Sequence, residues 1–190
     1  MKIFINAKTE DICKNIGAAL EELSADITHC FDDETAACTE LSEYDAVIVS
    51  TPLRSEFGLN FVTETSKSSG AAIVILSRAD IAEDVQGRIK FTGAFVIGKP
   101  FPKSVLANTV KMAILAKENI MRLEQEKDEL SKQLDDVKII DRAKCCLIEY
   151  LNLTENQAHR HIQKLAMDTR RSQREIADDI LRTYSGMTNV

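Results

Sequence analysis

The sequence lacks any apolar run that approaches the roughly 18 residues that a helix needs to span a bilayer. The first stretch, MKIFINAKTE, has only a short apolar segment and lacks the hydrophobic region of a signal peptide. These absences exclude a membrane-spanning protein and argue against a secreted one. We therefore expect a cytoplasmic chain with no membrane partner.

Cysteine occurs, but not in a pattern that suits disulfides or metal binding. The five cysteines are Cys13, Cys30, Cys38, Cys145 and Cys146. Their number is odd and no C-x-x-C pair occurs, which argues against a disulfide framework. The adjacent pair is too closely spaced on a helix for zinc, and His159 and His161 face different directions. We expect buried or half-buried thiols in a reducing compartment, and no metal site.

Catalytic signatures are missing as well. The sequence shows no nucleophile beside a base, no cluster of metal ligands and no glycine-rich loop for phosphates. We therefore expect no enzyme activity and no cofactor.

Charge is distributed unevenly along the 190 residues, which together carry a net charge of −6. Residues 1–137 hold 15 Lys and Arg against 23 Asp and Glu, whereas residues 138–190 hold 9 against 7. An acidic first part and a mildly basic last part are typical of a regulatory domain joined to a nucleic-acid-binding domain. The basic excess is small, so it does not establish nucleic-acid binding alone.

Five short segments rich in Val, Ile and Phe alternate with five segments of helical length. The predicted strands are Lys2–Asn6, Asp26–Phe31, Asp45–Ser50, Ala71–Leu76 and Gly93–Gly98. Three of them are nearly continuous apolar runs, as in strands buried on both faces. The alternation predicts an α/β domain with a five-stranded, doubly wound parallel sheet over residues 1–111. Functional residues should lie at the carboxyl ends of its strands, where Asn6, Ser50, Ser77 and Lys99 stand.

This first domain resembles the receiver domains of bacterial response regulators. The resemblance lies in the strand–helix order and in DAVIVS (Asp45–Ser50), Gly58, Leu76–Ser77 and GKPF (Gly98–Phe101). It implies that Ser77 and Lys99 occupy the positions that hold phosphoryl oxygens. It also implies an acidic pair for Mg²⁺ after the first strand and a phosphate-accepting aspartate after the third.

Those acidic residues are absent. Asn6 and Ala7 stand at the positions of the acidic pair, and Ser50 stands at the position of the phosphate acceptor. An amide and a methyl group supply almost no ligands for Mg²⁺, and no base is visible to activate the serine. We expect a pseudo-receiver with a degenerate pocket, in which Lys99 either binds an anion or points at solvent. An unidentified protein or ligand would then act on this domain.

From Lys103 to Leu151 the sequence contains no Gly or Pro, which predicts one long helix. Apolar residues in the segment 112–138 recur at heptad spacing with charged neighbours, although Lys127 interrupts the pattern. This favours a coiled-coil linker and a parallel homodimer; a helix packed back on its own first domain is the alternative. The residues expected in the dimer contact are Ile120, Leu123, Leu130, Leu134 and Val137.

Residues 139–190 show the pattern of three short amphipathic helices. Thr154-x-x-Gln157 and Ser172-x-x-Glu175 are capping boxes that open the second and third. Since no helix buries its apolar face alone, we expect a small bundle. The predicted stripes are Ile140, Ala143, Leu147 and Leu151 on the first helix, Ala158, Ile162, Leu165 and Ala166 on the second, and Ile176, Ala177, Ile180, Leu181 and Tyr184 on the third.

Arginines gather at the turn between the last two helices. Arg170 and Arg171 suit the C-terminal end of a helix dipole, whereas Arg174 stands unfavourably in the first turn of the next helix. A phosphate bound at that helix N-terminus would reconcile the arrangement; solvated corner charges are the alternative. The predicted basic surface comprises Arg142, Lys144, Arg160, Lys164, Arg170, Arg171 and Arg174.

Residues 140–181 resemble the ANTAR domain, an RNA-binding output module found behind receivers in bacterial regulators. The matching motifs are DRAK (Asp141–Lys144), Leu147, L-x-L-x-x-x-x-A (Leu151–Ala158), LAMDTRR (Leu165–Arg171) and IADDIL (Ile176–Leu181). Cys145 replaces a small residue of the family and is expected to be packed. The resemblance implies a dimer that binds tandem hairpins in leader transcripts and prevents formation of a terminator.

Two other classes of function remain open. SQREIADDIL also resembles part of a DNA-binding helix-turn-helix, although Asp178 and Asp179 on the candidate reading helix suit a phosphate-lined groove poorly. The other class is a dimeric protein-interaction scaffold that binds no nucleic acid.

Overall fold

The computed structural model describes residues 1–31, 40–53 and 57–185. The chain divides into two compact units, Met1–Arg122 and Leu123–Val190. The long helix α5 (Lys103–Leu151) contributes to both units and has the bounds that its composition predicts. Among the described helices, none combines the length and the apolar content that a membrane span requires.

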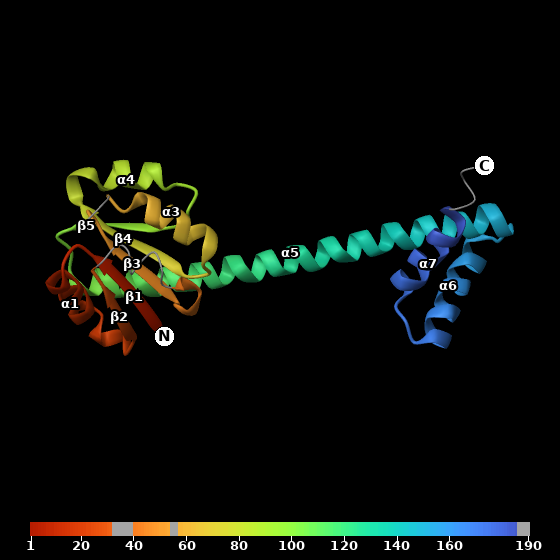
Figure 1. The fold of residues 1–190 in the computed structure, drawn as a ribbon, viewed down its shortest axis with the longest axis horizontal. Helices are drawn as coiled ribbons and strands as arrows, with labels where there is room; N and C mark the ends of the chain where they lie inside the picture. Colours follow the sequence, from red (N-terminus) through yellow and green to blue (C-terminus); the bar gives the residue numbers. More distant parts are fainter. Residues whose placement is uncertain (32–39, 54–56, 186–190) are drawn as a thin grey trace. The chain divides into compact units, whose positions relative to one another are not determined.

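The first unit contains a five-stranded sheet with the strand order β2-β1-β3-β4-β5 (Figure 1). The strands are β1 (Lys2–Ala7), β2 (Asp26–Cys30), β3 (Ala46–Ser50), β4 (Ala72–Arg78) and β5 (Phe95–Lys99). Every neighbouring pair is parallel, so the predicted doubly wound α/β class is confirmed. The predicted strand ends are shifted by at most two residues.

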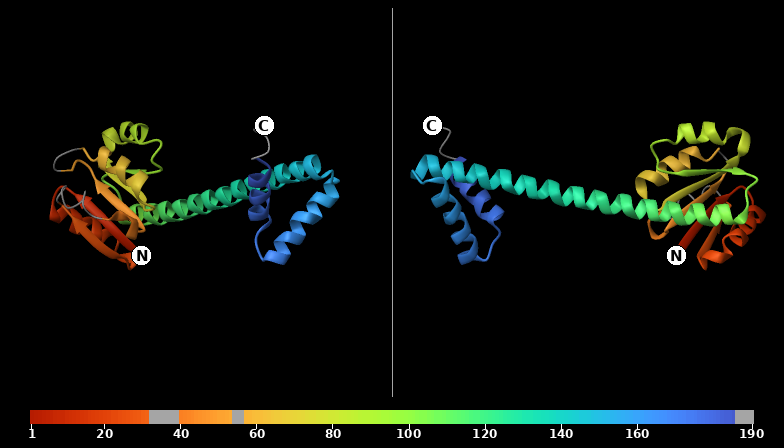
Figure 2. Two further views of the ribbon diagram at one scale, coloured as in Figure 1. Left: turned by 45° about the vertical axis from the view of Figure 1, so that its right-hand side comes forward. Right: turned by 180° about the vertical axis from the view of Figure 1, so that it is seen from behind.

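Helices cover both faces of this sheet, as the two views of Figure 2 show. The helices α1 (Glu10–Ala19) and the first turns of α5 pack on one face, and α3 (Leu59–Ser68) and α4 (Ala82–Arg88) pack on the other. Short 3-10 helices lie at Glu21–Leu23, Leu41–Glu43 and Ala79–Ile81. The helix that the sequence predicts between β2 and β3 falls mainly on residues 32–39, outside the described residues.

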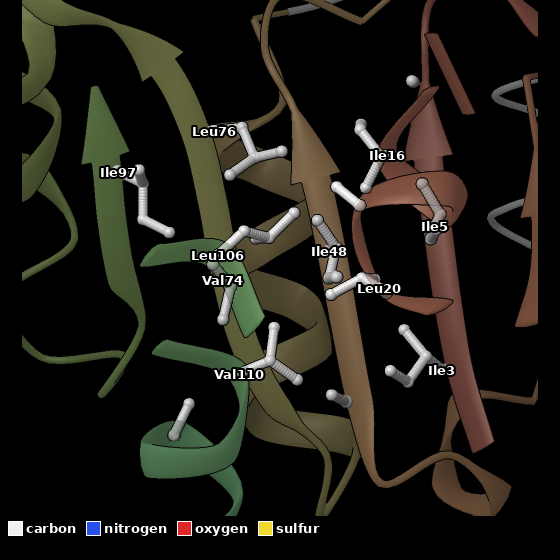
Figure 3. Packing of buried hydrophobic residues seen from close by; sticks show 14 of the residues in the cluster. Ile3, Ile5, Ile16, Leu20, Ile48, Val74, Leu76, Ile97, Leu106 and Val110 are labelled. Carbon is white, nitrogen blue, oxygen red and sulfur yellow. The ribbon is translucent and has the colours of Figure 1, made fainter. Parts of the chain in front are cut away.

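Successive strand residues point to opposite faces, and this alternation builds two apolar layers. Ile3 and Ile5 join the layer beneath α1 and α5, whereas Phe4 joins the layer beneath α3 and α4. Figure 3 shows the first layer, in which Leu106 of α5 lies against the sheet beside Val74. All five side chains are essentially inaccessible to solvent, which explains the continuous apolar runs of the strands.

The second unit is a bundle of the last turns of α5, α6 (Glu155–Thr169) and α7 (Gln173–Ser185). The predicted three-helix arrangement and its stripes are confirmed except at Leu151, and the separate prediction that Cys145 is packed is wrong. Leu151 is 47% exposed, because it is the last residue of α5 and lies beyond the apolar core of the bundle. Cys145 is exposed, because it lies about 200° around the helix from the buried Ala143; Cys146 packs against the core instead.

Candidate functional site

The turn that presents the arginines is fixed by caps on both of its helices. At the start of α6, the Gln157 N–H donates to Thr154 Oγ1 at 3.4 Å, and the Thr154 N–H donates to Gln157 Oε1 at 2.9 Å. At its end, Arg170 adopts a left-handed conformation with φ of 53°, and the Arg171 N–H donates to the Ala166 carbonyl at 3.0 Å. The bonds between Thr154 and Gln157 open α6, and the Arg171 bond ends α6 and fixes where the chain enters α7.

The predicted capping box of α7 is present too. The Ser172 N–H donates to Glu175 Oε2 at 2.9 Å, and the Glu175 N–H donates to Ser172 Oγ at 3.2 Å. Ser172 Oγ also donates to Glu175 Oε2 at 2.9 Å, and the two hydrogen bonds that the backbone and hydroxyl of Ser172 donate to this carboxylate lower the pKa of Glu175. The first amides of α7 are therefore already satisfied in part by the protein itself, which weakens the hypothesis that a phosphate is needed there.

Three members of the predicted basic surface form ion pairs within the second unit. Arg171 Nη1 lies 2.6 Å from Asp179 Oδ2, and this hydrogen bond lowers the pKa of the carboxyl group. Arg174 pairs with Asp136 of α5 and, at 3.7 Å, with Asp178.

The third paired member is Lys144 of α5. Its Nζ lies 2.7 Å from Asp141 Oδ1 and 3.4 Å from Glu155 Oε1, so it links α5 to the first turn of α6. These three cations hold helices together and are less available to an outside ligand.

The other four members, Arg142, Arg160, Lys164 and Arg170, are exposed. None of the four forms an ion pair with any residue in the part of the chain that the structure describes. Arg160 and Lys164 are one helical turn apart on α6, opposite the buried Ile162 and Ala158, and so share its outward face. We call this pair and the nearby Met167 the outward face of α6.

A shallow hollow borders the outward face of α6 at Met167. Met167, one turn after Lys164, is 79% exposed, and it lines a shallow hollow of about 360 Å³. Gln163, Ala166, Arg171 and Gln173 complete the lining. An exposed methionine beside an arginine and two amide side chains suits an adaptable contact surface.

The degenerate receiver pocket lies at the carboxyl ends of adjacent strands, as the sequence predicts. Lys99, at the end of β5, reaches back to the end of β3, where its Nζ donates to Ser50 Oγ at 3.1 Å and to the Thr51 carbonyl at 3.0 Å. Its half-buried position lowers the pKa of Lys99, because burial disfavours the charged form. Lys99 therefore points at Ser50 and Thr51 and not at solvent, and anion binding by Lys99 stays a prediction.

Two buried polar side chains flank this contact. In the β1–β3 pairing, Asn6 stands opposite Val49, which is the residue before Ser50. In the β4–β5 pairing, Ser77 stands opposite Gly98, which is the residue before Lys99. Neither the Asn6 amide atoms nor Ser77 Oγ has a hydrogen-bond partner among the described residues. Ala7 contributes only a methyl group to the first apolar layer.

The pocket does not fit Mg²⁺. Among the described residues, the strand ends present an amide, hydroxyls and an ammonium group, whereas Mg²⁺ in proteins is bound by oxygen ligands that include carboxylates. Asp45 lies at the opposite end of β3, where its carboxylate accepts a hydrogen bond from the Lys2 N–H at 2.7 Å. In the described ranges, no three His, Cys, Asp or Glu side chains come together as metal ligands.

We expect the full chain to gain no mass on incubation with acetyl phosphate and Mg²⁺. Among the described residues, Ser50 Oγ is contacted by the Lys99 ammonium, which is a donor and not a base, and no group of metal ligands comes together. Intact-mass spectrometry measures this, with an ordinary receiver domain treated in parallel as the positive control. A stable phospho-adduct on Ser50 would contradict the prediction that the receiver pocket is degenerate.

Sequence reasoning missed several partners of these residues. Thr51 provides the second acceptor for Lys99, and Asp136 and Asp179 neutralise two of the arginines. The pair of Arg174 with Asp178 could have been predicted from the sequence, because residues at i,i+4 spacing on a helix are neighbours. Asp136 is 38 residues from Arg174, so only the packing of α7 on α5 reveals that pair.

Comparison with known proteins gives consistent matches for both units. The ANTAR domain model matches residues 128–181. The transcriptional regulatory protein PdtaR of Mycobacterium tuberculosis is 31% identical over 151 residues, which cover 79% of this chain and 73% of PdtaR.

Solved structures of response regulators also resemble part of the chain. A two-component response regulator from Clostridium difficile has a TM-score of 0.54 at 23% identity, covering 63% of this chain and 98% of that protein. The receiver domain of the Francisella response regulator 1452 has a TM-score of 0.52 at 22% identity, covering 60% and 97%. At these identities the likeness shows the receiver fold alone.

Proposed function

Because the chain belongs to the family of response regulators that carry an ANTAR domain behind a receiver domain, we propose that it controls transcription by binding structured RNA through its second unit. Bound RNA hairpins would prevent formation of a terminator. The observation that supports this most is the set of exposed cations that pair with no carboxylate among the described residues, above all Arg160 and Lys164 on the outward face of α6. Such cations attract and position phosphates.

The charges on α7 favour RNA over duplex DNA as the partner. In a helix-turn-helix, the N-terminal residues of the reading helix enter the major groove. Here those turns carry Asp178 and Asp179, whose carboxylates are engaged by Arg174 and Arg171. Because these carboxylates neutralise the arginines near the start of α7, the helix has little positive charge to offer a phosphate-lined groove. Folded RNA instead presents phosphates and unstacked bases on an open surface that a helix face reaches.

We propose further that the active form is a homodimer joined through α5. The first turns of α5 are buried on the sheet at Leu106 and Val110, so the helix does pack on its own domain there. Beyond them, the predicted contact residues Ile120, Leu123, Leu130, Leu134 and Val137 are between 47% and 63% exposed. An exposed apolar stripe at heptad spacing favours a second copy as its partner. Two copies would present two RNA-binding units, which suits tandem hairpins.

Leu130→Lys is expected to weaken this dimer by on the order of a hundredfold or more, since each of two buried leucines contributes about 1.5–3 kcal/mol. Analytical ultracentrifugation over a concentration series measures the change. The control is Gln125→Lys, which adds the same charge to an exposed position of α5 outside the stripe. Equal dissociation of both variants would refute α5 as the dimer contact.

The proposed RNA binding is tested by titrating the full chain against a stem-loop RNA and a duplex DNA of equal length at two salt concentrations. We expect tighter binding to the RNA and a loss of affinity at the higher salt concentration. Preference for the duplex would favour the helix-turn-helix alternative. Equal and feeble binding to both would favour the protein-interaction scaffold.

A further inference from the structure

We infer that Tyr150 and Tyr184 form a stacking platform for an unpaired base of the bound RNA. Tyr150 lies in the last turn of α5, and Tyr184 lies in the last turn of α7. This contact rests on the proposed function, RNA binding by the second unit, and specifies which part of the RNA is held.

The two rings lie face to face. Their centroids are 5.0 Å apart and their planes differ by 17°, which is a stacked arrangement. The packing of α7 along α5 brings them together: Arg174 at the start of α7 pairs with Asp136, and Tyr184 near its end meets Tyr150. The fold of the bundle therefore holds the ring pair in place.

The core of the second unit does not require the ring of Tyr150. The buried side chains of that core are Ala, Leu and Ile, and among the described residues its partly buried neighbours include Tyr184 but not Tyr150. Tyr150 is 37% exposed, and Tyr184 covers one face of its ring, so the exposed surface lies on the other face and the ring edge. From residue 139 onward, the sequence contains no other Phe, Tyr or Trp. The unit thus has an aliphatic core and presents an aromatic ring at its surface.

An open tyrosine face fits an unpaired base better than it fits other parts of an RNA. Bases of loops and single strands stack on aromatic rings, whereas bases within a duplex already stack on one another. A phenol ring offers a flat π face and no cation for a phosphate. Neither tyrosine hydroxyl forms a hydrogen bond with a residue that the structure describes, so both are available to a base edge or a ribose hydroxyl.

The platform would add selectivity that the exposed cations do not supply. Arg160 and Lys164 would position phosphates, which every nucleotide carries. A ring face instead selects nucleotides whose bases are free to leave the helical stack. The second unit would therefore favour a hairpin with an open loop over a continuous duplex.

The test is fluorescence anisotropy of the full chain with a labelled stem-loop RNA. Tyr150→Leu should weaken binding roughly fivefold or more, as expected for the loss of one base stacked on an aromatic ring. Tyr150→Phe keeps the ring and should bind within about twofold of the original chain. The matched control is Ile148→Ala, because Ile148 lies on the same turn of α5 and is also 37% exposed; it should bind like the original chain. Equal binding by Tyr150→Leu and the original chain, or equal losses in Tyr150→Leu and Ile148→Ala, would overturn the inference.

Two further measurements separate stacking from charge and from folding. On a stem-loop whose loop nucleotides are abasic, Tyr150→Leu should bind as well as the original chain, since no base remains to stack. The factor lost by Tyr150→Leu on the intact RNA should be the same at two salt concentrations, because stacking neutralises no phosphate. A loss that persists in full on the abasic RNA, or that disappears at high salt, would overturn the inference.

The same titrations distinguish failure of the platform from failure of the proposed function. An original chain that binds no stem-loop RNA would contradict the proposed function and the platform together. Binding that is indifferent to Tyr150 would contradict the platform alone.

Discussion

Replacing Arg160 and Lys164 together by alanine is expected to weaken the binding of a stem-loop RNA roughly thirtyfold, at about 1 kcal/mol for each lost phosphate contact. Both side chains are exposed and form no ion pair with a described residue, so their loss leaves the bundle intact. Alanine also favours the helix at both positions. Fluorescence anisotropy with a labelled RNA measures the affinity, and circular dichroism checks the helix content.

The matched control removes two other cations of the same unit, through Lys138→Ala and Arg182→Ala. Their side chains are 72% and 82% exposed, and the change in net charge is identical. We expect the control to retain its affinity to within about twofold, since general attraction between exposed charges is largely screened by salt. If control and test variants lose affinity equally, the RNA contact is not at the outward face of α6.

The second large effect concerns the stability of the second unit. Leu147→Ala is expected to unfold the bundle, because this side chain is 1% exposed and lies in the core with Ala143 and Ile162. A buried leucine replaced by alanine costs about 2–5 kcal/mol. The second unit, Leu123–Val190, holds only about 3–10 kcal/mol in total, at roughly 0.05–0.15 kcal/mol per residue. Urea denaturation followed by circular dichroism should show the loss of one helical transition, together with the loss of RNA binding.

Leu151→Ala is the matched control for that experiment. It makes the same substitution one helical turn later on α5, at a side chain that is 47% exposed. We expect a change of within about 0.5 kcal/mol, as for most surface substitutions. Comparable destabilisation by both variants would mean that the core of the bundle is not centred on Leu147.

Local rules predicted much of this molecule correctly from the sequence. The absence of Gly and Pro sets the bounds of α5, and the two capping boxes set the starts of α6 and α7. These features depend on residues that are close in the chain, so their physics is visible in the sequence. The strand ends of the first unit were predictable for the same reason, because apolar runs end where the sheet ends.

Features that depend on packing between distant segments were not predictable. Seven cations looked equivalent in the sequence, but α7 packs on α5 so that Arg174 meets Asp136. Lys99 approaches Thr51 only because β5 and β3 flank the same strand, β4. The exposure of Cys145 likewise depends on which side of α5 faces the bundle.

The salt dependence of RNA binding tests the central claim most directly. For the original chain, the logarithm of the association constant should fall linearly with the logarithm of salt concentration, with a slope that counts the neutralised phosphates. The variant with Arg160→Ala and Lys164→Ala should show a slope shallower by about 1.4–1.8, at roughly 0.7–0.9 for each of two contacts. Identical slopes in the two proteins would contradict the account, because they would show that neither side chain neutralises a phosphate.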